Sequence, residues 1–253
     1  IAGAGLFVLF SGRVVAVADM ASFGCAALAM LLVRAIEARP VREPGHWRTE
    51  MTAGIRFAMG NVALRRTTVA FAATMLMVGA VEALFFAYVG IGLHRPPAFI
   101  SVLLTAQGVG GLLGAGVASR VLRRIGEMGT LAVGLASFGV CMGLLIYPSL
   151  AVGFAAMPIA GASIAWIMVA YSTLLQRQTP GELMGRVSAA TGVLISGAQA
   201  LSIAAGAILV SLVDYRILFA VIAAAMLGIG GYLWLVRVPD EEPAVVPEPV
   251  AVA

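Results

Sequence analysis

The sequence predicts an all-α fold, a polytopic bundle of transmembrane helices, and three observations lead to this prediction. Hydrophobic residues make up 61% of the chain and charged residues only 11%, whereas about a quarter of the residues of a soluble domain are charged. Several apolar stretches approach the ~20 residues that a helix needs to cross a bilayer. No stretch shows the alternation over about ten residues that a transmembrane β-strand requires. The net charge of +4 therefore does not indicate a nucleic-acid partner; the expected partner is the lipid bilayer.

The apolar segments give the order of the elements. The chain opens with IAGAGLFVLF, which is too short to span a membrane and lacks the methionine and basic residues of a signal peptide. We expect it to be the end of a helix that begins upstream. Seven spans follow, at roughly 14–33, 67–89, 98–118, 128–147, 150–174, 187–212 and 217–236.

Two polar segments divide these spans into parts. The loop 34–66 contains an apolar stripe at helical spacing with arginines outside it, which predicts an amphipathic helix on the inner membrane face. The tail 237–253 is acidic and rich in proline, and we expect it to be disordered. The stripe consists of Met51, Ile55, Met59 and Val62. The expected parts are the end of an N-terminal bundle (1–34), a central loop (35–66), a six-helix bundle (67–236) and a tail (237–253).

The arginines predict the orientation. All sixteen basic residues are arginine, and thirteen of them fall in alternate loops while three fall in the others. Because positive residues favour the cytoplasmic side, we expect the loop 34–66 and the C-terminus in the cytoplasm of a cell-membrane protein.

The segment LLQRQTPGELMGRVSAATG, residues 174–192, is a polar interval between two apolar spans. Thr179, Pro180 and Glu182 have the spacing of a capping box with proline at the first helical position. Arg177 and Arg186 would hold this loop on the cytoplasmic side. The pattern predicts a capped and anchored loop.

Three motifs resemble the major facilitator superfamily, in particular its branch of drug and siderophore exporters, which includes enterobactin and macrolide exporters. DMASF at 19–23 is similar to the Asp-x-x-Ser-Phe of helix six in that branch. WRTEMTAGIRF with LRR is similar to its central loop, and LLQRQTPGELMGRVSA to its loop between helices ten and eleven. The resemblance covers the chain except the tail, and the last motif is the most specific.

The resemblance implies a twelve-helix fold, of which this chain is the C-terminal portion: the end of helix five and then helices six to twelve. The missing N-terminal helices would complete a substrate cavity between two pseudo-symmetric halves. The superfamily loop motif is only partly present in GVASRVLRRIGEMG, because Arg123 stands where an acid is expected. The residues implied for cytoplasmic gating loops are Arg120, Arg124, Gly126, Pro180, Glu182, Gly185 and Arg186.

Two carboxylates are candidates for coupling to protons or substrate. Glu82 is the one carboxylate well inside any of the last six predicted spans, and ionisable residues within a membrane usually face a cavity or a partner. A structural carboxyl is the alternative. Asp19 belongs to the helix-six motif, and its favoured interpretation is a residue at a helix end or in an interhelical hydrogen bond.

Further polar groups are candidates for a substrate cavity: Gln107, Trp166 and Gln199. Interhelical hydrogen bonding explains the glutamines equally well, and packing is the more common role of a tryptophan. The pairs Gly110 and Gly114, and Gly139 and Gly143, have the spacing of close helix contacts. Pro158 predicts a kink in its helix.

The function expected from these residues and the resemblance is secondary transport, with proton-coupled efflux of a hydrophobic small molecule. No cofactor or metal site is expected, because Cys25, Cys141, His46 and His94 form no ligand cluster and no nucleotide-binding motif is present. An intramembrane enzyme would need a catalytic constellation that the spans lack. A membrane scaffold or sensor without transport remains the alternative.

Overall fold

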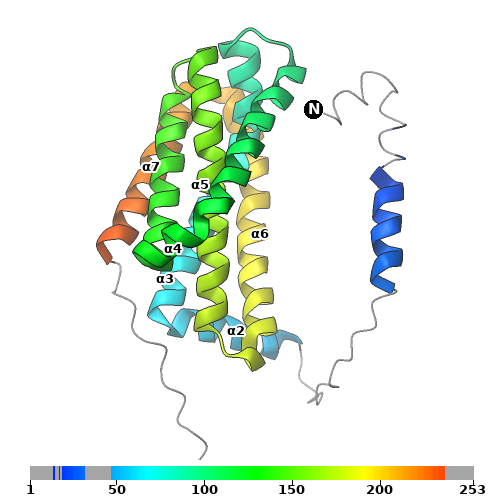
Figure 1. Ribbon diagram of the computed structural model, residues 1–253, viewed down its shortest axis with the longest axis vertical. Helices are drawn as coiled ribbons and strands as arrows, with labels where there is room; N and C mark the ends of the chain where they lie inside the picture. Colours follow the sequence, from blue (N-terminus) through cyan, green and yellow to red (C-terminus); the bar gives the residue numbers. More distant parts are fainter. Residues whose placement is uncertain (1–13, 15–16, 18, 32–46, 237–253) are drawn as a thin grey trace, which may run out of the picture. The chain divides into compact units, whose positions relative to one another are not determined.

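The structure is a computed structural model that describes residues 14, 17, 19–31 and 47–236 (Figure 1). No strand occurs among these residues, as the sequence predicted. Contacts divide the chain into two compact units, Ile1–Trp47 and Arg48–Ala253. The predicted helix end at 1–10, the loop segment 34–46 and the tail lie outside the described residues.

The first unit contains the apolar helix Asp19–Leu31, which lies inside the predicted span 14–33. Near its start, the Ser22 hydroxyl donates a hydrogen bond to the Asp19 carbonyl oxygen at 2.7 Å. This bond satisfies one backbone group of the Asp-x-x-Ser motif.

The second unit is a bundle of long helices, shown in Figure 1. Within the described part of the chain, five helical segments are long and apolar enough to cross a membrane. Six of the predicted spans lie inside these segments to within about three residues, although the predicted span 128–147 runs past the helix end at Leu144. The elements are α2 (Trp47–Gly60), α3 (Val62–Ala87), the π-helix η1 (Tyr88–Gly92), the 3-10 helix η2 (Pro97–Phe99), α4 (Ile100–Leu144), α5 (Leu150–Gln178), α6 (Gly181–Leu212) and α7 (Tyr215–Val236).

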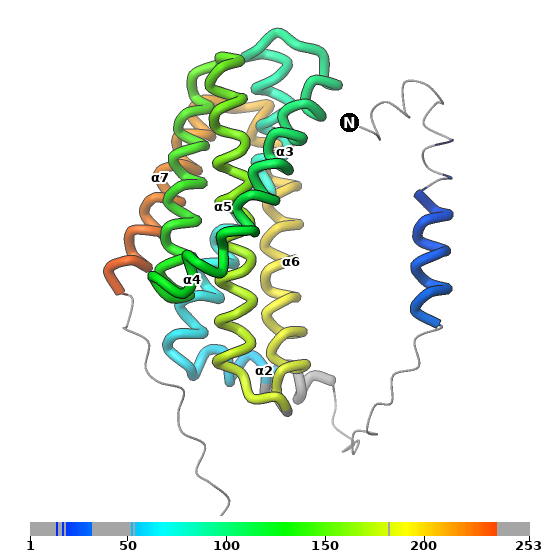
Figure 2. Tube along the Cα trace, in the orientation of Figure 1, coloured from blue at the N-terminus to red at the C-terminus, as the bar shows by residue number. Residues whose placement is uncertain are grey.

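Helix α4 covers most of two predicted spans, 98–118 and 128–147. Its backbone leaves the helical region at Gly126, where φ is 72° and ψ is 174°, and Figure 2 shows the chain reversing direction there. We call residues 100–125 the first arm and residues 127–144 the second arm. The turn at Gly126 therefore separates two helical arms, and each arm carries most of one predicted span.

Replacing Gly126 by alanine is expected to destabilise the bundle by about 1–3 kcal/mol, because this φ/ψ combination is accessible almost only to glycine. Gly116→Ala is the control, since a Cβ there meets nothing within 4 Å and alanine favours helix. Thermal unfolding of the purified variants in detergent measures the difference. Equal melting temperatures would show that the turn adopts another geometry.

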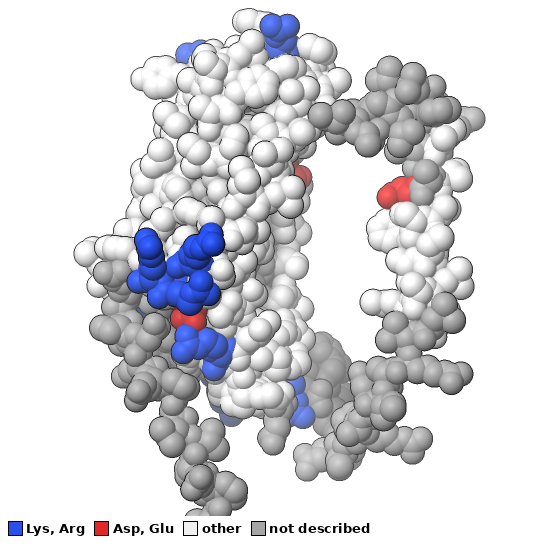
Figure 3. Space-filling model, viewed as in Figure 1, with Lys and Arg blue, Asp and Glu red and all other residues white. Residues whose placement is uncertain are grey.

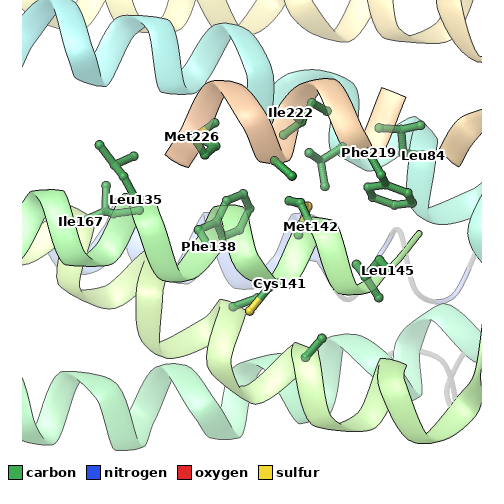
Figure 4. Close-up of a cluster of buried hydrophobic side chains, with 14 of the residues drawn as sticks. Leu84, Leu135, Phe138, Cys141, Met142, Leu145, Ile167, Phe219, Ile222 and Met226 are labelled. Atoms are coloured by element: carbon green, nitrogen blue, oxygen red, sulfur yellow. The ribbon is translucent and has the colours of Figure 1, made fainter. Parts of the chain in front are cut away.

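A buried apolar cluster joins α3, α4, α5 and α7. Figure 4 shows Phe138 and Met142 of the second arm facing Ile222 and Met226 of α7. These four side chains are at most 4% exposed. Because lipid is as apolar as this core, the benefit of the cluster comes from close packing rather than from removal of water.

Glycines bring the first arm of α4 directly against α5. A Cβ on Gly110 would overlap the backbone of Pro158, and a Cβ on Gly161 would overlap the Gln107 carbonyl oxygen. The Trp166 indole N–H donates to the Gly114 carbonyl oxygen at 3.0 Å. The predicted close contact at the first glycine pair is therefore confirmed, and α5 is its partner.

Helices α3 and α6 form a second close pair. The Ala80 backbone N–H donates to the Ser202 hydroxyl at 2.9 Å. A Cβ on Gly79 would approach both Ser202 and the Gln199 carbonyl oxygen to 2.7 Å, and a Cβ on Gly206 would approach Ala80. The two backbones therefore lie too close for larger side chains at these positions.

The predicted capping box at the start of α6 is wrong. Thr179 lies outside the helix with extended backbone, and Pro180 is the N-cap without a side-chain hydrogen bond. The Thr179 hydroxyl is buried and has no hydrogen-bond partner among the described residues. Tertiary packing covers this hydroxyl, so it does not serve the first turn of α6.

The amphipathic helix predicted in the central loop corresponds to α2. Among the α2 residues whose burial the structure describes, Gly54 and Ala58 are buried, whereas Ile55 of the predicted stripe is 44% exposed. A Cβ on Gly54 would meet the Arg186 backbone and the Ala190 side chain. Helix α2 therefore uses its smallest residues to lie close against α6.

Candidate functional site

A pocket of ≈ 160 Å³ lies among α3, α4, α5 and α6 and contains Gln199. Apolar side chains form most of its wall, and the polar groups are Gln199 and Thr74. The Thr74 hydroxyl donates to the Ala70 carbonyl oxygen at 2.8 Å, so the Gln199 amide is the main polar group offered to a ligand. The other lining residues are Met75, Val78, Phe138, Ile164, Ile167 and Met168.

Glu82 lies on the same stripe of α3 as this pocket. It follows Val78 by four residues and Met75 by seven, and such positions share one helix face. It also follows Gly79, which packs against the Gln199 backbone. Glu82 is exposed in the second unit, so the face of α3 that carries the pocket ends in an accessible carboxylate.

An aromatic pair that the sequence analysis missed borders this region. Phe71 of α3 and Tyr171 of α5 stack with ring centroids 4.1 Å apart and planes 11° apart. The Tyr171 hydroxyl is buried without a hydrogen-bond partner among the described residues. Tyr171 follows Met168 by three residues and Phe71 precedes Thr74 by three, so the pair lies about one turn from the pocket wall. No sequence signal linked two aromatic residues in separate spans.

The other cavity candidates are placed elsewhere. The Trp166 indole N–H is hydrogen-bonded to the Gly114 carbonyl oxygen, which favours a packing role for Trp166 over contact with a substrate. The Gln107 backbone lies at the Gly161 contact, and Gln107 does not line the Gln199 pocket. Asp19 belongs to the first unit, so it is not assigned to this pocket.

The predicted gating residues gather at one end of the second unit, which we call the arginine-rich end. Arg120 and Arg124 are exposed beside the turn at Gly126, and Figure 3 shows basic side chains gathered over the bend of α4. Pro180 begins α6, which also carries Gly185 and Arg186. Arg120 and Arg124 therefore lie beside the turn inside α4, and Pro180, Gly185 and Arg186 lie at or near the start of α6.

An ion pair joins α4 and α5 at this end. Arg177 at the end of α5 donates to the Glu127 carboxylate, which follows the turn at Gly126. The Glu127 side chain is 10% exposed and the Arg177 side chain is 46% exposed. The pair therefore ties the turn of α4 to the end of α5.

The Glu127–Arg177 pair is expected to have a coupling free energy of unfolding of only about 1 kcal/mol, because Arg177 is half-exposed and solvent screens the interaction. The measurement is a double-mutant cycle of Glu127→Gln and Arg177→Gln, followed by thermal unfolding in detergent. A second cycle pairing Glu127→Gln with Arg65→Gln should give a coupling near zero. Equal couplings in the two cycles would contradict a specific pair.

Comparison with known proteins adds no name to this site. No family model, curated protein or solved structure matches the chain. Among the described residues, no group of three or more His, Cys, Asp and Glu could hold a metal ion. The groups of this region that the structure describes are the accessible Glu82 carboxylate, the Gln199 amide in an apolar pocket and the Glu127–Arg177 ion pair.

Proposed function

We propose that this chain is the second half of a secondary active transporter of the major facilitator type, which exports a hydrophobic small molecule in exchange for protons. The observation that carries the proposal is Glu82 within an apolar helix, on the same face as the Gln199 pocket. A carboxyl group in a membrane is unfavourable unless it serves a cavity, a partner or a proton pathway.

The pocket supports a hydrophobic substrate. Its wall is apolar apart from Gln199 and Thr74, and an apolar pocket with few polar groups is typical of small-molecule sites. Gln199 would orient the substrate through its amide, and Glu82 would bind a proton or a cationic group of the substrate. At ≈ 160 Å³ the pocket is smaller than the ~300–1,000 Å³ of ordinary ligand sites, which fits a cavity that the N-terminal helices would complete.

The arginine-rich end suits a cytoplasmic gate. The Glu127–Arg177 pair connects the turn of α4 to the end of α5, and Asn61 donates to the Gln178 side chain at 3.1 Å. These contacts link α3, α4 and α5 at one level. Transport by rocking of two halves would make and break such contacts at the cytoplasmic side.

A vesicle experiment tests the proposal. The complete protein, with the N-terminal helices that the resemblance implies, is reconstituted in vesicles and the movement of an apolar fluorescent dye is followed with and without a pH gradient. If the protein is a transporter, dye movement should depend on the pH gradient. Dye movement equal to that of protein-free vesicles under both conditions would contradict transport and favour a scaffold or sensor.

The proposed orientation places the arginine-rich end in the cytoplasm. Single-cysteine variants at Arg48 and Arg95, in a background with Cys25 and Cys141 replaced by alanine, are labelled from outside intact cells. The cysteine at 95 should react and the cysteine at 48 should stay unlabelled until the cells are opened. The reverse pattern would overturn the orientation.

A further inference from the structure

A groove of ≈ 500 Å³ separate from the Gln199 pocket lies between the start of α3 and the end of α7. Two arginines line its end nearest the start of α3, and apolar or small residues line the remainder. Among the residues that the structure describes, none of those lining the groove is acidic. The lining residues are Arg65, Arg66, Val69, Ala70, Ala73, Gly228, Ile229 and Tyr232.

We propose that this groove binds one phospholipid with an anionic headgroup. Arg65 and Arg66 would bind the phosphate, and one acyl chain would lie along α3 toward Ala73. The proposal requires that the bundle lies in a membrane, and it is independent of transport.

One end of the groove is cationic and the other end is apolar, which matches the charged headgroup and the apolar acyl chain of a phospholipid. Arg65 and Ala73 are eight residues apart on α3, which corresponds to ~12 Å along the helix axis. The groove therefore changes from cationic to apolar over a distance comparable to a headgroup and the first part of an acyl chain. A soluble anion would use only the arginine end.

The two arginines are placed differently within the groove. The Arg66 guanidinium donates to the Val236 carbonyl oxygen at the end of α7, at 3.5 Å, which holds this side chain across the groove. Arg65 is exposed. A cation that is already fixed beside an exposed one forms a site for a phosphate group, because arginine donors suit its oxygen atoms.

Aromatic residues mark this level as the membrane interface. Tyr232 is 53% exposed and Trp234 is 38% exposed near the end of α7. Tyrosine and tryptophan are enriched where headgroups meet the hydrocarbon core. Basic pockets between transmembrane helices at this level bind anionic headgroups, so the occupant that the charge and depth of the groove favour is a lipid.

The groove exists because small residues leave room for an acyl chain. A Cβ on Gly228 would meet no atom within 4 Å. A leucine at this position therefore fits the fold and fills the groove. Gly116 is equally open and lies on the first arm of α4, so Gly116→Leu is a matched control.

The test uses delipidated protein titrated with phosphatidylglycerol or phosphatidylcholine and native mass spectrometry of the lipid adducts. The wild type should bind phosphatidylglycerol more tightly. Arg65→Gln should lower the affinity for phosphatidylglycerol about fivefold, which corresponds to ~1 kcal/mol of binding free energy. The affinity for phosphatidylcholine should stay unchanged. Gly228→Leu should lower the affinity for both lipids, whereas Gly116→Leu and Arg123→Gln should change neither affinity.

Other outcomes would overturn the proposal. Equal effects of Arg65→Gln and Arg123→Gln would mean general attraction to the protein surface. Unchanged binding by Gly228→Leu would place the acyl chain elsewhere. Competition by soluble glycerol phosphate as strong as that by the lipid would identify a soluble phosphate as ligand. A large gain in lipid affinity after neutralising Asp240, Glu241 and Glu242 would identify the acidic tail as the occupant.

Discussion

Glu82→Gln is expected to abolish pH-driven transport while the protein remains folded in the membrane. Glutamine keeps the size and most of the hydrogen bonding of glutamate, but it neither ionises nor exchanges a proton. Glu82 is exposed on α3, so the substitution does not disturb packing within the second unit. Dye movement in vesicles with an imposed pH gradient should fall to the level of protein-free vesicles.

The matched control is Asp214→Asn, because Asp214 is also exposed but lies in the turn between α6 and α7. Its oxygen accepts the Arg216 backbone N–H at 2.8 Å, and the asparagine oxygen preserves this bond. Transport by the control should equal that of the wild type. Normal transport by Glu82→Gln across neutral pH would make Glu82 a structural carboxyl and remove the central residue of the proposal.

Gly161→Leu is expected to prevent α4 and α5 from packing and to destabilise the bundle by about 3 kcal/mol or more. Even a Cβ at this position would overlap the Gln107 carbonyl oxygen and approach the Gly111 backbone nitrogen to 2.7 Å. Both neighbours are backbone atoms of a long helix, so neither can move aside without moving the first arm. The Trp166 bond to Gly114 would be lost as well.

The control is Gly108→Leu on the first arm, where a Cβ meets no atom within 4 Å. Size-exclusion chromatography in detergent and thermal unfolding should show a monodisperse, stable control and an aggregated or strongly destabilised Gly161→Leu. A Gly161→Leu protein as stable as the control would mean that the two helices lie further apart than the structure places them.

The sequence alone determined the helical class and the position of the apolar helices. These follow from a local rule, because each segment in a bilayer must satisfy its own backbone hydrogen bonds and helices do so within one segment. The predicted span 67–89 lies inside α3 and η1, and the span 217–236 lies inside α7. Hydropathy detects only the apolar part, so it missed the helical continuation of the first arm through the arginines near Gly126.

The sequence could also identify candidate groups, but not their neighbours. Glu82 was found because a carboxylate stands out in an apolar segment, and Gln199 because it interrupts another. Only the structure placed Gln199 in a pocket and Glu82 on the helix face that borders it. It also assigned Trp166 to a contact with Gly114, which a single span cannot reveal.

Pairings between distant residues were decided by the tertiary structure alone. Glu127 and Arg177 are 50 positions apart, and Phe71 and Tyr171 lie on α3 and α5. Thr179 shows the converse, because its local spacing predicted a capping box and packing buried its hydroxyl instead. The free energy of forming a helix in one segment is set by nearby residues and the surrounding lipid. Local patterns therefore determine which segments become helices. Which side chains meet depends on how small residues let whole helices approach, and that is a property of the assembled bundle.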